Sequence, residues 1–319
     1  MMEAQEEGDE IFVYMGGDQE VPMHIRRARI HRSVKIILEE AFRHRQQLIS
    51  VEFHDGIEII EERAFLGCRS LRGSIKLLGI KIIKVRAFYF CSDLTDVEFG
   101  DKLETIEEGA FYQCAALRNI TMPQVRTIGG YAFYECGELT ELELPEGLET
   151  LQRSAFRGCV SLTRIALPLK DGMIKEYLFH NCPVLASVNP VGGIHKTVQS
   201  LHLESWRNEM KNEISRINRV LSHHHFPSKT EVVQQWETSV IQRLNHYKAE
   251  HIKLLKEAAT LLELALWKAN LDEIDGGVVE REGARTTRGQ RKRARKEICV
   301  TSGASIVIKN VLPFLKLVE

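Results

Sequence analysis

The stretch Ile83–Phe99, IKVRAFYFCSDLTDVEF, contains the pattern that decides the fold. Measured from the phenylalanine of its Ala-Phe pair, apolar residues stand five positions before it and three, six, nine and eleven positions after it. The last two apolar positions alternate with polar residues, which is the period-two pattern of a half-buried strand. This short stretch therefore predicts one strand and one buried turn.

The same pattern recurs along the first two thirds of the chain. Its phenylalanines are 22 or 23 residues apart and stand at Phe42, Phe65, Phe88, Phe111, Phe133, Phe156 and Phe179. Six of the seven cysteines occupy the position three residues after the phenylalanine, and Arg45 takes that position in the first unit. The second unit has one extra residue before Ile75, which we expect to lie in a loop because the phase recovers afterwards. A unit of this size cannot bury its own apolar face, so the units are predicted to stack around one continuous core.

The repeat L-x-x-[IV]-x-[LF]…[IV]-x-x-[IL]-x-x-x-A-F-x-x-C resembles the BspA-type (Treponema-type) leucine-rich repeat over residues 24–193. This resemblance implies a leucine-rich-repeat solenoid, which is β-rich and has a parallel strand ladder on its concave face. It also implies that the chain has no catalytic residues. The joining of such repeats to a helical tail is similar to that in proteins of this family from diatoms.

Beyond the repeats, the apolar residues recur at helical spacing, which predicts a C-terminal α-helical hairpin with a coiled-coil seam. The chain is expected to be a monomer or a coiled-coil dimer. In chain order, the predicted segments are an acidic flexible N-terminus (1–10), an N-terminal cap and half-repeat (11–33), the solenoid of seven 22–23-residue units (34–193), the helical hairpin (194–275), a basic flexible linker (276–297) and an apolar C-terminal segment that docks on the helices (298–319).

One outward residue lies between the two buried residues of each predicted strand, and these residues, Ala166 among them, should form a ladder across the concave face. Between residues 93 and 149 the chain carries thirteen acidic and three basic residues, a net charge of −10. Such a field favours a basic protein partner over nucleic acid, because phosphate binding needs Lys and Arg. A merely solvated surface is the alternative interpretation. The candidate partner-binding residues are Glu52, Lys76, Asp96, Glu98, Thr121, Glu141, Glu143 and Arg164.

A second charged feature lies in segment 285–296, which has seven positive charges in twelve residues and no acid. Such clusters are typical of nuclear-import signals and of weak nucleic-acid contacts, although a solvated linker has the same composition. The candidate contact residues are Arg291, Lys292, Arg293, Arg295 and Lys296.

The composition excludes several other classes of protein. The chain has 319 residues, a net charge of −1, and no apolar run long enough for a membrane span. An odd number of cysteines and an acidic beginning without a leader pattern predict a cytoplasmic or nuclear location. We find no nucleotide, metal or nucleophile motif, so no cofactor and no catalysis are expected. The leading hypothesis is a non-catalytic intracellular scaffold for protein–protein interaction, and the alternative is a nuclear or nucleic-acid-associated adaptor that acts through segment 285–296.

Overall fold

The computed structural model describes residues 11–17, 19–191, 204–223 and 229–279. The chain divides into two compact units, Met1–Ile241 and Gln242–Glu319, and each is treated by itself. Three predicted features lie outside the described residues: the acidic segment 1–10, the basic residues Arg291, Lys292, Arg293, Arg295 and Lys296, and the apolar segment 298–319.

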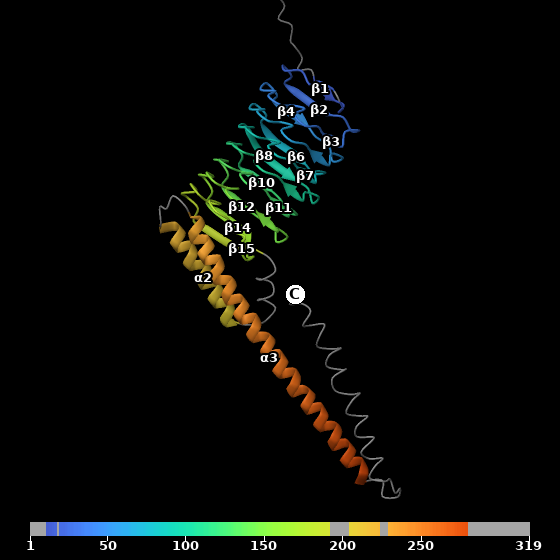
Figure 1. The fold of residues 1–319 in the computed structure, drawn as a ribbon, viewed down its shortest axis with the longest axis vertical. Coiled ribbons are helices and arrows are strands. Elements are labelled where there is room, and N and C mark those ends of the chain that lie inside the picture. The colour runs from blue at the N-terminus through green and yellow to red at the C-terminus, as the bar shows by residue number, and fades with distance from the viewer. Residues whose placement is uncertain (1–10, 18, 192–203, 224–228, 280–319) are drawn as a thin grey trace, which may run out of the picture. The chain divides into compact units, whose positions relative to one another are not determined.

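The repeats form a solenoid whose longer strands lie side by side on one face, here called the long-strand face (Figure 1). Every pairing between these strands is parallel, and they form three sheets with the orders β1-β2-β4, β10-β8-β6 and β12-β14-β15. The predicted leucine-rich-repeat solenoid with a parallel strand ladder is therefore confirmed. The strands are β1 (Ile11–Tyr14), β2 (Arg27–Ile30), β4 (Ser50–Glu52), β6 (Gly73–Leu77), β8 (Leu94–Phe99), β10 (Asn119–Thr121), β12 (Glu141–Glu143), β14 (Arg164–Pro168) and β15 (Ser187–Val191).

The short strands form a second parallel sheet of six members, which the sequence pattern did not predict. The second residue of each short strand is the apolar residue five positions before the core phenylalanine, and it is buried. Two residues are too few to display a period of two, so the pattern marked this position as core without marking a strand. The strands are β3 (Ile36–Ile37), β5 (Ile59–Ile60), β7 (Ile82–Ile83), β9 (Thr105–Ile106), β11 (Thr127–Ile128) and β13 (Thr150–Leu151).

The core phenylalanines stack along the solenoid. From Phe42 to Phe156 the ring centroids of neighbours are 4.8–5.5 Å apart and the ring planes differ by at most 14°. The backbone reverses tightly around them, and the residues two before and two after each phenylalanine have positive φ. Gly158 occupies one such position, where a Cβ would lie 2.7 Å from Cγ of Glu135. The register between β6 and β8 shifts between Gly73 and Ser74, where Thr95 of β8 is left without a Cα partner, and the loop residues Leu71 and Arg72 precede β6.

The six described cysteines are all buried and free. Each thiol donates a hydrogen bond to the carbonyl oxygen of the phenylalanine in the preceding unit, with Sγ–O distances of 2.9–3.3 Å. Burial raises the pKa of these thiols, to about 12 for Cys68 and Cys182. In the first unit Arg45 fills the position, and its Nε donates to the carbonyl of Val21 at 2.9 Å. The cysteine column is therefore part of the hydrogen-bonded core.

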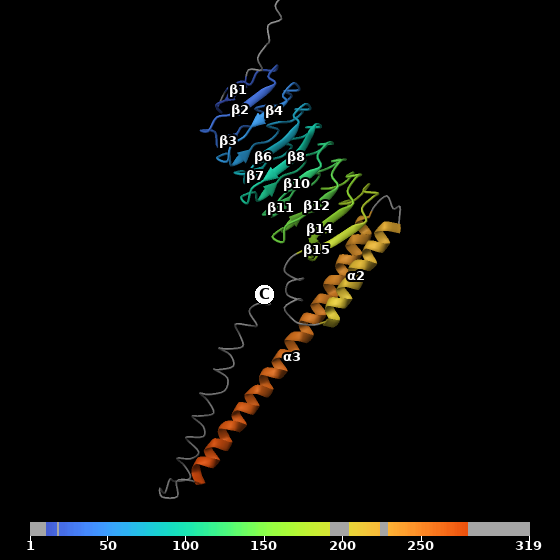
Figure 2. The same ribbon diagram turned by 180° about the vertical axis from the view of Figure 1, so that it is seen from behind.

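Two helices follow the repeats, α2 (Glu204–His223) and α3 (Thr230–Val279). The predicted boundary at residue 275 falls inside α3. Both views show α2 beside β15 and the beginning of α3 (Figures 1 and 2). Among the described residues, no helix is both long and apolar enough to cross a membrane.

The beginning of α3 and the end of α2 satisfy backbone groups that the last repeat would otherwise leave unpaired. Oγ1 of Thr230 accepts a hydrogen bond from the backbone N–H of Phe179 at 2.9 Å, and Oδ1 of Asn218 accepts one from Val188 at 2.9 Å. Nζ of Lys229, which is buried, donates to the carbonyl of Leu185 at 2.5 Å. Buried backbone donors and acceptors need partners, and no further repeat follows to supply them. These side chains therefore close the C-terminal end of the sheet.

Candidate protein-binding groove

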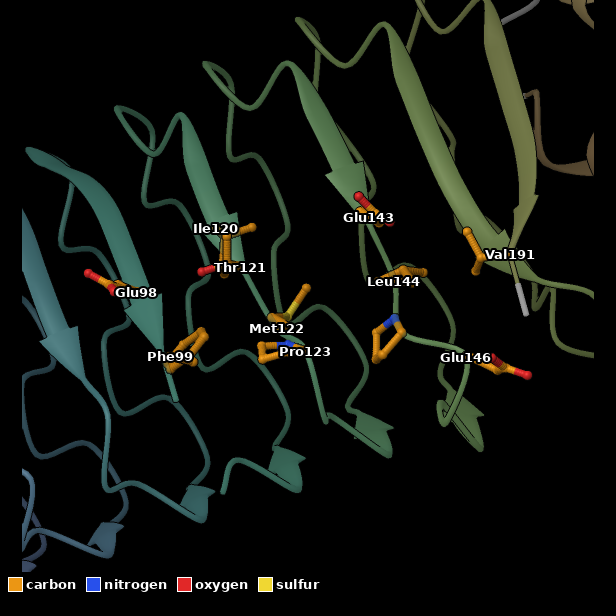
Figure 3. A pocket seen from close by; sticks show the side chains of 11 residues that line it. Glu98, Phe99, Ile120, Thr121, Met122, Pro123, Glu143, Leu144, Glu146 and Val191 are labelled. Atoms are coloured by element: carbon orange, nitrogen blue, oxygen red, sulfur yellow. The ribbon is translucent and has the colours of Figure 1, made fainter. Parts of the chain in front are cut away.

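A hollow of about 520 Å³ lies on the long-strand face where three successive strands, β8, β10 and β12, end (Figure 3). This volume is within the range of ordinary ligand pockets. We call it the groove, and it is lined by Glu98, Phe99, Ile120, Thr121, Met122, Pro123, Glu143, Leu144, Pro145, Glu146 and Val191.

The groove coincides with an interruption in the strand ladder. Within the described residues, β10 pairs with β8 and β12 pairs with β14, but β10 and β12 belong to different sheets. Five residues separate β10 from β11, whereas six separate β12 from β13, so the connection after β10 is the tighter one. Pro123 and Pro145 follow the two strands at equivalent positions, and proline has no N–H to extend a ladder. The two prolines therefore lie directly beside the interruption.

The floor of the groove is apolar and its rim is acidic. Phe99, Met122, Pro123, Leu144 and Val191 lie in a row across it (Figure 3). The acidic rim consists of Glu98, Glu143 and Glu146. A ligand that fits this arrangement has an apolar side chain, which lies over the floor, next to a positively charged group, which faces the rim.

The two acidic strand residues of the rim differ in their neighbours. Oε2 of Glu98 lies 3.0 Å from Nζ of Lys76 on the adjacent strand. Glu143 makes no ion pair with any residue that the structure describes. An unpaired carboxylate is the better receptor for an incoming cation, because no existing pair must be broken first. We therefore place the centre of the site at Glu143.

Of the eight candidate residues from the sequence, the structure brings three into the groove: Glu98, Thr121 and Glu143. The other five lie elsewhere on the long-strand face, and they are Glu52, Lys76, Asp96, Glu141 and Arg164.

The candidate acids outside the groove are bonded to residues one repeat away. Glu52 is paired with Arg29, whose hydrogen bond lowers the pKa of the carboxyl. Glu141 lies 3.6 Å from Arg164. These pairs reduce the attraction that the same acids could exert on a partner.

Asp96 and Ala166 also differ from the exposed, unbonded side chains that the ladder was expected to present. Asp96 accepts hydrogen bonds from Thr95 at 2.6 Å and from Asn119 at 2.7 Å, and these bonds lower its pKa. Ala166, which we expected to point outward, is only 4% exposed. It stands in register between Glu143 and Asn189, and the longer neighbours flank its methyl group. The ladder is therefore not a uniform row of exposed side chains.

Sequence reasoning missed the floor of the groove. The repeat pattern predicts Phe99, Met122 and Leu144 as core residues, which their burial confirms, but it does not indicate that they border a hollow. The signal that could have located the site is the unit of 22 residues between Phe111 and Phe133, together with prolines at equivalent positions of neighbouring units. The described residues contain no cluster of three or more His, Cys, Asp or Glu side chains that could hold a metal ion.

Comparisons with known proteins agree with the repeat pattern. The sequence model of the BspA type leucine rich repeat region matches six copies, over residues 23–125 and 81–210. A search of curated proteins found no match.

Several solved structures are similar to parts of this chain. A T. pallidum leucine rich repeat protein is 29% identical, with a TM-score of 0.42, and the match covers 45% of this chain and 70% of that one. A leucine-rich repeat protein from Eubacterium ventriosum ATCC 27560 is 24% identical, with a TM-score of 0.40, over 42% of this chain and 37% of that one. A third, from Bacteroides ovatus ATCC 8483, is 21% identical, with a TM-score of 0.33, over 52% and 56%.

Proposed function

Because the chain belongs to the BspA-type leucine-rich repeat family, we propose that it is a non-catalytic scaffold that binds a basic protein segment in the groove. The observation that carries this proposal is the acidic rim around an apolar floor. The partner segment carries a Lys or Arg next to an apolar side chain, so that the cation meets Glu143 while the apolar group covers Pro123 and Pro145, which are more exposed than the other apolar residues of these two strand ends.

The construction of the groove supports binding without a large ordering cost. Its floor residues Phe99, Met122 and Leu144 are buried, and Phe99 packs edge-on against Phe111 with ring centroids 6.1 Å apart. A pre-formed surface loses little conformational entropy when a partner docks. In such sites the charges mainly raise the rate and specificity of association, whereas the desolvated apolar centre supplies much of the affinity.

A labelled peptide can test this proposal. We suggest a fluorescein-labelled twelve-residue peptide of alternating Leu and Lys as the probe, and the matching Leu/Glu peptide as its charge-reversed counterpart, with binding measured by fluorescence anisotropy. Glu143→Lys should weaken binding of the Leu/Lys peptide about tenfold, because an attractive charge becomes a repulsive one. Glu231, an exposed acid at the start of α3, provides the matched control as Glu231→Lys, which should change the affinity less than twofold. Equal losses in the two variants would show that the peptide senses only the net charge.

For the location of the chain, we propose the cytoplasm or the nucleus. Support for the nucleus, and for the second candidate function as a nuclear or nucleic-acid-associated adaptor, comes from the seven positive charges of segment 285–296. A fluorescently tagged chain in which Arg291, Lys292, Arg293, Arg295 and Lys296 are all replaced by Ala should leave the nucleus if this segment directs import. An unchanged distribution would show that this segment does not direct nuclear import, and would count against the adaptor function.

A further inference from the structure

A second surface of the solenoid carries tyrosines and arginines at the turns around the core phenylalanines. We call it the Tyr–Arg stripe. Its aromatic members are half-buried except for Tyr177, which is 49% exposed. It comprises Tyr89, Phe90, Tyr112, Tyr131, Tyr134 and Tyr177 together with Arg69, Arg86, Arg153 and Arg157.

The stripe is built around three tyrosines, each of which directly follows a core phenylalanine. The rings of Tyr89 and Tyr112 are 4.4 Å apart with an angle of 8°, and those of Tyr112 and Tyr134 are 4.5 Å apart with an angle of 9°. Burial is the main reason that the pKa of Tyr112 is raised to about 12, so its hydroxyl remains neutral and can donate a hydrogen bond. The three rings form one stacked surface, in which the hydroxyl of Tyr134 is hydrogen-bonded to Glu135.

The fold itself does not require aromatic residues at this position. The equivalent residue is Leu66 in the second unit, Arg157 in the sixth and His180 in the seventh. Three consecutive tyrosines are therefore a local property of the middle repeats. Tyrosine and arginine are residue types enriched at the centres of protein interfaces.

The four arginines differ from those of the long-strand face, such as Arg29 and Arg164, which are paired with acids. Their guanidinium carbons lie 5.7–6.0 Å from the centroids of aromatic rings. None of the four makes an ion pair with a described residue. The nearby acid Glu135 accepts a hydrogen bond from Gln113. The stripe thus has four arginines that make no ion pair with a described residue, although the acid Glu135 lies beside Tyr134.

We propose that the Tyr–Arg stripe binds an acidic segment of a partner protein. Carboxylates of that segment pair with the guanidinium groups of Arg86, Arg153 and Arg157, which can bind them with two parallel hydrogen bonds. Apolar side chains of the same segment lie against the edges of the stacked rings. Single-stranded nucleic acid fits less well, because bases stack on aromatic faces and the faces of Tyr112 are already covered by Tyr89 and Tyr134. This surface is separate from the groove, so the chain would hold two partner segments of opposite charge.

The test uses a full-length variant that lacks the positive charges of segment 291–296, because these could also bind an acidic probe. In this background Arg291, Lys292, Arg293, Arg295 and Lys296 are all replaced by Gln. The probe is the fluorescein-labelled Leu/Glu peptide, with binding measured by anisotropy. The combined variant Arg86→Gln, Arg153→Gln and Arg157→Gln should bind this probe about tenfold more weakly, because three positive charges are lost while the ring stack remains.

The matched control is the combined variant Arg118→Gln and Arg126→Gln, whose guanidinium groups are paired with Glu138 and Glu149. It should bind the Leu/Glu peptide as the background does. Three results would each overturn the proposal: an equal loss in this control, no binding by the background chain, or tighter binding of a twelve-nucleotide oligo-dT than of the peptide. The Glu143→Lys variant should retain Leu/Glu binding while losing Leu/Lys binding, which distinguishes failure of this proposal from failure of the groove.

Discussion

Replacing Glu237 with glutamine should make the protein less sensitive to pH. Glu237 is only 1% exposed and lies where α3 meets the last repeat. Its Oε2 accepts a hydrogen bond from the backbone N–H of Ile174 at 3.4 Å, while Oε1 has no hydrogen-bond partner among the described residues. A carboxylate in this setting loses its hydration and gains one long hydrogen bond. Burial is accordingly the main reason that its pKa is raised from 4.5 to about 7.

The sign and size of the effect follow from this pKa difference. A carboxyl with a raised pKa in the folded state binds a proton more tightly when folded, so the free energy of unfolding falls as the pH rises from 4.5 to about 7. Above pH 7 the loss is complete. Since one pKa unit corresponds to 1.36 kcal/mol, the total is about 3 kcal/mol. Glutamine keeps an acceptor for the Ile174 N–H but has no charge, so this loss should be absent from the variant.

Urea unfolding followed by far-UV circular dichroism at pH 5, 6, 7 and 8 measures the effect. The difference in unfolding free energy between Glu237→Gln and the wild type should grow with pH and level off above pH 7, in favour of the variant. Glu231→Gln is the matched control, because Glu231 is an exposed carboxyl on the same helix and its removal should give no such trend. Parallel pH curves for Glu237→Gln and the wild type would refute the reasoning, since they would mean that the folded state stabilises the carboxylate as well as water does.

Three further predictions concern the core of the repeats. Phe111→Ala should lower the unfolding free energy by about 3–5 kcal/mol, because it removes a fully buried ring between two stacked neighbours, whereas truncation of the half-buried Phe90 should cost less; urea unfolding measures both, and similar values would mean that the stack contributes little. The thiol of Cys114, whose pKa burial raises strongly, should react with a thiol reagent at pH 8 only after denaturation, and prompt reaction of the folded protein would contradict its burial. Gly158→Ala should destabilise the fold by about 1–3 kcal/mol, because φ is +79° there and the added Cβ would meet Glu135; an unchanged thermal midpoint would show that the turn can relax.

The sequence predicted the fold because the solenoid repeats one set of contacts. Equivalent residues of the repeats, such as the phenylalanines and the cysteines, are buried in the same surroundings. The same buried positions therefore recur in seven copies of the sequence pattern, which makes them easy to recognise. The groove does not repeat. It lies where β10 and β12 fail to pair, which is a departure from the pattern. A method that finds the average repeat therefore finds the core and overlooks the site.

The sequence was least informative about which charges on the surface are free to attract a partner. The net charge of −10 between residues 93 and 149 counts only bases inside that window. Stacking places residues one repeat apart side by side, so acids in the window pair with bases outside it. Glu98 lies 3.0 Å from Lys76, Glu107 lies 3.6 Å from Lys84, and Glu141 lies 3.6 Å from Arg164.

The charge that matters for binding is therefore what remains after the neighbouring rungs have been paired. On the long-strand face Glu143 remains without an ion pair among the described residues, beside an apolar floor. On the Tyr–Arg stripe, four arginines from three repeats remain unpaired with described acids, beside aromatic rings. Exposed ion pairs contribute little to stability and little to attraction, whereas an unpaired charge next to an apolar surface can contribute to both affinity and specificity. In a stacked repeat protein, partner sites should therefore be sought where the pairing between rungs fails, and not where a window of sequence carries the most charge.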